Sequence, residues 1–163
     1  MSSNERYVGP QRSMSPRVII ARLYAVNSRP RSIIVHTMSS NCSFLHRFPV
    51  VESHMTPLDH THGLHRTYVR VTHRDQHDRV KTSYFRCYFR CCSNLPSNRT
   101  LGIRGEVVIV RMSHQDFFRV ADVCLSDRRL ADHVATVLAP KLHEFQVNRT
   151  RVASFGTIFP GTF

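Results

Sequence analysis

The alternation of apolar and polar positions is most regular in the last third of the chain. Residues 106–112 are rich in β-branched side chains and follow Gly105, a pattern typical of a strand. A return strand is expected over residues 117–125. Three of its apolar residues share one face: Ala121, Val123 and Leu125. We therefore expect a β-hairpin over residues 106–125.

A helix is expected directly after this hairpin. Ser126 is placed where its hydroxyl can accept a hydrogen bond from an unpaired backbone N–H, and Asp127 complements the positive helix end. Pro140 is expected to end the helix, because proline lacks the backbone N–H. Apolar residues form one stripe along the helix: Leu130, Val134, Val137 and Leu138. The result is a β-β-α unit at residues 101–140.

Two earlier hairpins are also predicted. Residues 67–72 alternate Val69 and Val71 with polar positions, and a polar insert leads into a second strand over residues 80–89. Near the start, two apolar runs within residues 18–38 flank a segment rich in turn-forming residues.

These patterns predict an α+β fold: a small antiparallel sheet with a C-terminal helix packed on one face. The N-terminal part is poorly specified. Three regions follow from this interpretation. They are a basic, irregular and loosely ordered N-terminal region over 1–65, a small α+β domain over 66–145, and a C-terminal tail over 146–163. A chain of 163 residues is long enough for one ordinary domain.

Positive charge is the most unusual feature of the composition. The formal net charge is +12, and residues 1–50 hold seven arginines against one acid. Arginine donates a planar fork of hydrogen bonds that matches phosphate, so the charge predicts binding to nucleic acid or another polyanion. Codon bias is an alternative origin of the excess of arginine over lysine. The arginines that we select for polyanion binding are Arg86, Arg90, Arg128 and Arg129.

Residues 84–90 interleave arginines with aromatic residues. With a strand period of two, Tyr84, Arg86 and Tyr88 share a face, and Phe85, Cys87 and Phe89 share the other. Aromatic rings stack on bases, and guanidinium groups bind phosphate. The alternative, which the pattern favours, is a half-buried structural strand. No signature of a known RNA- or DNA-binding module is present.

Histidine and cysteine residues suggest two metal sites. A structural zinc ion is the alternative cofactor, because two imidazoles and two thiolates can close a tetrahedral site. Its ligands would be His73, His77, Cys87 and Cys91. The spacing of His60, His62 and His65 resembles the H-x-H-x-D-H motif of the metallo-β-lactamase superfamily. Leu64 stands where that family has its metal-binding aspartate, so the two-metal chemistry is unsupported.

Other features bear on function class and compartment. The five cysteines follow no apolar signal segment, and no apolar run is long enough to cross a membrane. We therefore expect an intracellular protein, nuclear or cytoplasmic, with reduced thiols. Residues 1–35 are rich in Arg and Ser, so the alternative is a mitochondrial protein with a cleaved leader. No glycine-rich phosphate loop is present, and a non-enzymatic protein that binds a polyanion or a protein partner is favoured.

Three segments of the C-terminal half carry a resemblance. They are a Leu-Pro-x-Asn segment at residues 95–98, a Gly-acid-apolar strand at 105–110 and an Asp-led helix at 127–132. In these segments the chain resembles small uncharacterised proteins of mushroom-forming fungi over about residues 83–138. The resemblance implies no particular activity.

Overall fold

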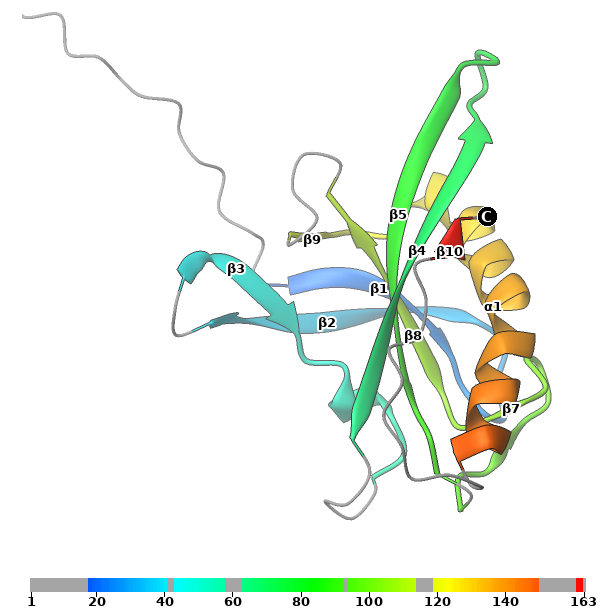
Figure 1. Cartoon of the computed structure of the whole chain (residues 1–163). Helices are drawn as coiled ribbons and strands as arrows, with labels where there is room; N and C mark the ends of the chain where they lie inside the picture. Colours follow the sequence, from blue (N-terminus) through cyan, green and yellow to red (C-terminus); the bar gives the residue numbers. More distant parts are fainter. Residues whose placement is uncertain are drawn as a thin grey trace, which may run out of the picture.

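A computed structural model describes residues 18–40, 43–57, 63–92, 94–113, 119–149 and 161–162. Strands form one curled sheet, and a long helix lies along one side of it (Figure 1). In chain order the elements are β1 (Val18–Tyr24), β2 (Arg31–Ser40), β3 (Ser43–Pro49), the short 3-10 helix η1 (Glu52–His54), β4 (Leu64–Arg74), β5 (Val80–Arg90), β6 (Ser97–Asn98), β7 (Ile103–Arg104), β8 (Val107–Met112), β9 (Val120–Ala121), the 3-10 helix η2 (Leu125–Asp127), α1 (Arg128–Arg149) and β10 (Gly161–Thr162).

Six of these strands form the body of the sheet in the order β4-β5-β8-β1-β2-β3. Every pairing among them is antiparallel. Of the two short strands at its margins, β9 pairs with β8, and β10 pairs in parallel with β4. The remaining strands, β6 and β7, form a separate two-stranded hairpin. Figure 1 shows the β4–β5 hairpin extending beyond its neighbours.

The predicted fold class is wrong, because the sheet is large and the N-terminal part contributes to it. Strand β1 lies between β8 and β2, with Leu23 opposite Val108 and Ile20 opposite Ile34. The physical reason lies in β8, where every residue from Val107 to Val110 is buried. A strand that is apolar on both faces needs covering on both sides, and an isolated β-β-α unit covers only one.

Each face of the sheet carries its own apolar cluster. On the helix side, Val107 and Ile109 pack with residues of α1 that include Val134 and Leu138. On the opposite side, Val108 and Val110 pack with residues of β1, β2 and the segment around η1. Val108, Val110, Val134 and Leu138 are all buried, as the apolar character of residues 106–112 and of the helix stripe leads one to expect.

Helix α1 is longer than predicted. It continues through Pro140 to Arg149, so the prediction that Pro140 ends the helix is wrong. The proline ring is exposed, whereas Leu142 and Gln146 beyond it are buried. Burial of this last part against the sheet stabilises the helix despite the backbone hydrogen bond that proline cannot donate.

The helix also starts differently from the prediction. Ser126 lies inside η2, the 3-10 helix that leads into α1, and Cys124 occupies the N-cap position of η2. The backbone N–H of Cys124 donates to Oδ2 of Asp127 at 3.2 Å. An aspartate carboxylate, rather than the serine hydroxyl, therefore caps this end.

The three hairpin predictions fare differently. The one within residues 18–38 is confirmed, because β1 and β2 pair antiparallel. The hairpin over residues 67–89 is confirmed and extends to residues 64–90. In the hairpin over 106–125, the described part of the return strand is only β9, and residues 114–118 lie outside the described residues. Leu125 begins η2 and is 74% exposed, whereas Val123 is buried, so the prediction that these residues share one strand face is wrong. No helix among the described ranges is both long and apolar enough to cross a membrane.

Candidate functional site

The β4–β5 hairpin owes its register to a turn organised by Asp75. One oxygen of this carboxylate, Oδ1, accepts hydrogen bonds from the backbone N–H groups of His77 at 2.8 Å and Arg79 at 3.0 Å. The other oxygen, Oδ2, lies 3.0 Å from Nζ of Lys81. A side chain that accepts bonds from the following backbone fixes the turn and thereby the pairing of both strands.

This register builds a two-row pattern of arginine and tyrosine. Because cross-strand partners point to the same side, paired residues are direct neighbours. Every second cross-strand pair in this part of the hairpin places an arginine opposite a tyrosine. The three pairs are Arg66 with Tyr88, Tyr68 with Arg86, and Arg70 with Tyr84. We call these six residues the Arg–Tyr face. It lies on the side of the sheet opposite α1, since Val69 and Phe85 between them pack with the helix.

Exposure falls across the Arg–Tyr face from β4 to β5. Arg66 and Arg70 are exposed, and the side chain of Tyr68 is 46% exposed. Its β5 partner Arg86 is only 1% exposed, and Tyr88 is 5% exposed. The face therefore has a solvent-exposed row on β4 that rests on a buried row on β5.

A buried guanidinium supports the exposed ring. The Cζ atom of Arg86 lies 4.7 Å from the ring centroid of Tyr68, and Nη1 of Arg86 donates to Oη of Tyr88 at 3.2 Å. Burial raises the pKa of Tyr88, and the nearby charge of Arg86 opposes this shift. Tyr88 thus stays a neutral phenol at neutral pH, and the cation–π contact holds the ring of Tyr68 over Arg86.

The charged residues on the two strands of this face are all basic. Neither β4 nor β5 contains an acidic residue. Within the described residues, no carboxylate forms an ion pair with Arg66 or Arg70. Two carboxylates on the helix side are engaged by other arginines: Asp127 pairs with Arg111, and Asp132 pairs with Arg22.

The selected polyanion-binding arginines do not form one site. Arg86 and Arg90 lie on β5, with side chains on the face opposite α1. Arg128 and Arg129 lie at the start of α1, on the other side of the sheet. Three exposed members of the Arg–Tyr face were not selected from the sequence: Arg66, Tyr68 and Arg70. Their alternation with buried valines was the available signal, but only the hairpin register shows which β5 residues they face.

The four proposed zinc ligands are also spread along the hairpin. His73 lies opposite Lys81, and its Nε2 is 2.9 Å from Oγ of Ser83. Cys87 lies opposite Thr67, six positions from His73 and thus about 20 Å away along the strand. Its pKa is raised by burial, which favours the thiol over a metal-binding thiolate. His77 belongs to the turn, and Cys91 follows the far end of β5.

No group of three or more potential metal-ligating side chains gathers anywhere in the described part of the chain. His60 and His62 lie outside the described residues. The third histidine of that motif, His65, packs its ring 5.7 Å from Phe89 and 5.5 Å from Phe145, between centroids. These ring contacts place His65 at the margin of the helix-side core.

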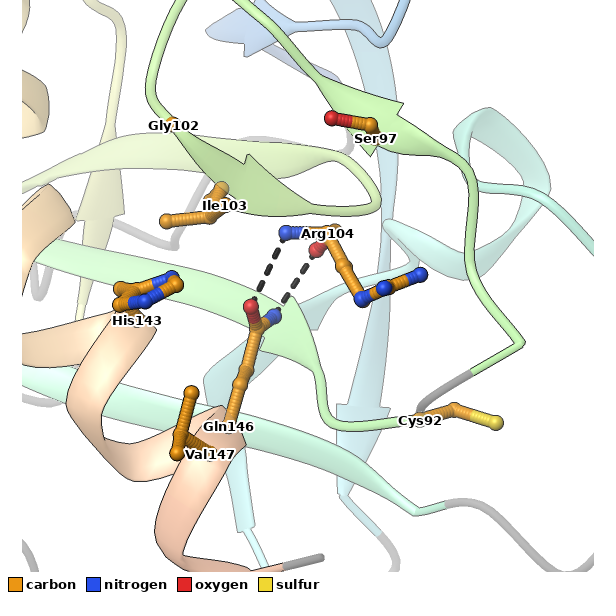
Figure 2. A pocket seen from close by; sticks show the side chains of 8 residues that line it. All are labelled: Cys92, Ser97, Gly102, Ile103, Arg104, His143, Gln146 and Val147. Atoms are coloured by element: carbon orange, nitrogen blue, oxygen red, sulfur yellow. Dashed lines mark hydrogen bonds between the residues drawn. The ribbon is translucent and has the colours of Figure 1, made fainter.

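A pocket of about 340 Å³ lies between the β6–β7 hairpin and the end of α1 (Figure 2). Gln146 lines this pocket and bonds to the backbone of β7. Its Oε1 accepts a hydrogen bond from the backbone N–H of Arg104 at 2.9 Å, and its Nε2 donates one to the carbonyl of Arg104 at 2.8 Å. Figure 2 shows His143 and Cys92 on opposite sides of Gln146, so in this pocket the thiol does not lie beside the imidazole. The amide joins α1 to β7 as a neighbouring strand would, which is a structural role.

No protein-family model, curated protein or solved structure matches this chain. The resemblance over residues 83–138 to small proteins of mushroom-forming fungi stays a prediction.

Proposed function

We propose that this protein binds polyanions through the Arg–Tyr face. The observation that carries the proposal is that arginine faces tyrosine in three cross-strand pairs of a hairpin whose strands contain no acidic residue. Exposed arginines without a neighbouring carboxylate attract phosphate or sulfate groups, and release of counterions adds to the affinity.

The spacing of the exposed arginines favours a chain of anionic groups over a single ion. Arg66 and Arg70 are four residues apart on one strand, which is about 13 Å along its axis. One phosphate cannot bridge that distance, whereas successive groups of a linear polyanion can contact both guanidiniums.

Salt dependence tests the proposal. Fluorescence anisotropy with labelled heparin, polyphosphate and oligothymidylate should show affinity falling steeply between ~50 and ~200 mM salt. The double variant Arg66→Gln/Arg70→Gln should lower the magnitude of the slope of log K against log salt by about 1.5, because each lost contact removes ~0.7–0.9.

The matched control changes two arginines on the other side of the sheet. Arg128→Gln/Arg129→Gln removes the same net charge. Because these two arginines lie away from the Arg–Tyr face, their loss should reduce the affinity much less and leave the salt slope close to native. A flat salt response, or equal losses for the two double variants, would remove the proposal.

A further inference from the structure

We infer that the polyanion is a single-stranded nucleic acid, with a base stacked on Tyr68 and phosphates held by Arg66 and Arg70. This inference rests on the proposed function and specifies the ligand of the same face. Its starting observation is that Tyr68 lies between two exposed arginines on one strand.

Core packing does not account for the exposed ring of Tyr68. Neither apolar cluster includes it, although its neighbours Val69 and Tyr88 belong to the clusters on the two faces. With 46% of the residue exposed, the ring gains little from burial in the protein. An aromatic ring in that position is available to a ligand with a flat, apolar surface of its own.

The ring is also held in place before any ligand arrives. The guanidinium of Arg86 lies beneath it at 4.7 Å, and Arg86 is fixed by its bond to the Oη of Tyr88. Holding the ring against a buried cation reduces the conformational entropy lost on stacking. A base on the exposed side of the ring would complete a layered arrangement of base, tyrosine and guanidinium.

The order arginine, tyrosine, arginine distinguishes among classes of polyanion. Side chains two residues apart on a strand point the same way at about 7 Å spacing, so the ring stands between two cations. Unpaired bases linked by phosphates present flat and anionic groups in the same alternation. Duplexes keep their bases stacked inside, and heparin or polyphosphate has no flat ring, so these ligands would leave Tyr68 unused.

Ring-free variants of Tyr68 test the inference. Tyr68→Thr and Tyr68→Ile remove the ring but introduce β-branched side chains, which suit a strand, and Tyr68→Phe keeps the ring. Affinity of oligothymidylate for each ring-free variant should fall by about tenfold or more, with the salt slope unchanged, because stacking is not an ionic contact. Binding of polyphosphate should stay within about twofold of native, since the arginines remain. Tyr68→Phe should retain most of the affinity for oligothymidylate.

The outcomes separate this inference from the proposed function. Equal affinity for oligothymidylate and polyphosphate, with no effect of either ring-free variant, would overturn the inference and leave polyanion binding intact. Parallel losses for both ligands would assign Tyr68 a structural role and also overturn it. Preference for a duplex of the same sequence would do so as well. Absence of salt-dependent binding to every ligand would remove the proposed function itself.

Discussion

At the residue scale, Asp75 shows how one carboxylate positions a distant surface. It lies at the tip of the hairpin, yet its bonds to the turn determine which β5 residue faces each residue of β4. The hydrogen bond from Lys81, followed by those from the backbone of Arg79 and His77, lowers its pKa from 3.8 to about 2. The ionised form is therefore the one that the folded turn favours.

Neutralising Asp75 should destabilise the protein in a pH-dependent way. Because its folded pKa is depressed, its charge contributes stability above the ordinary pKa, and this contribution is lost as the pH falls toward about 2. We expect Asp75→Asn to lower the Tm at neutral pH and the difference from native to shrink between pH 5 and pH 2. Thermal unfolding followed by circular dichroism measures this. Glu144→Gln, on an exposed position of α1, is the control and should show no such trend. A pH-independent difference for Asp75→Asn would contradict the argument.

At the scale of elements, the path of α1 past Pro140 shows packing overriding local preference. Proline removes the bond to the carbonyl of Thr136, four residues earlier, and normally costs a helix interior about 3 kcal/mol. The helix nevertheless continues, because Leu142 and Gln146 are buried beyond the proline. Gln146 adds hydrogen bonds to the backbone of Arg104 and to the carbonyl of Arg90.

Replacing this proline should therefore stabilise the protein. Pro140→Ala restores the backbone donor at an exposed position, so we expect the free energy of unfolding to rise by about 1–3 kcal/mol in urea titrations. His143→Ala also improves helix propensity at an exposed site but restores no bond, so it should add less than ~1 kcal/mol. A loss of stability for Pro140→Ala would show that the proline ring is itself needed for packing.

At the scale of the whole molecule, the N-terminal strands hold the sheet together. Ile19, Ala21 and Leu23 of β1 are buried in the cluster opposite α1. On the helix side of the same strand, Oη of Tyr24 donates to Oδ1 of Asp132 at 2.7 Å. Strand β1 thus contributes residues to the apolar clusters on both faces of the sheet, and it pairs with both β2 and β8.

Truncation tests this role. Deleting residues 1–35 removes β1 and the first half of β2, so we expect loss of cooperative unfolding and exposure of the edge of β8. Deleting residues 1–17 removes none of the described strands and should preserve a cooperative transition. A deletion of 1–35 that unfolds cooperatively at the native Tm would contradict this role, and would be compatible with a leader cleaved at that position.

Much of the local structure could be predicted from the sequence, because it depends on neighbours along the chain. The alternation around Val69 and Val71 predicts β4, and the apolar stripe through Val134 and Leu138 predicts the buried side of α1. The candidate site was only half predicted. The shared face of Tyr84, Arg86 and Tyr88 follows from a period of two, but its β4 partners follow from strand register.

By itself, the sequence determined β1, β2, β4, β5 and β8, the apolar stripe of the helix and the excess of positive charge. These properties depend on side-chain period and composition, which a short window contains. Tertiary structure alone decided that β1 inserts beside β8, that α1 passes Pro140, and that arginine faces tyrosine across β4 and β5. Each of these features depends on contacts between residues that are distant in sequence. Such contacts stabilise the fold only when both apolar faces of the sheet are covered at once.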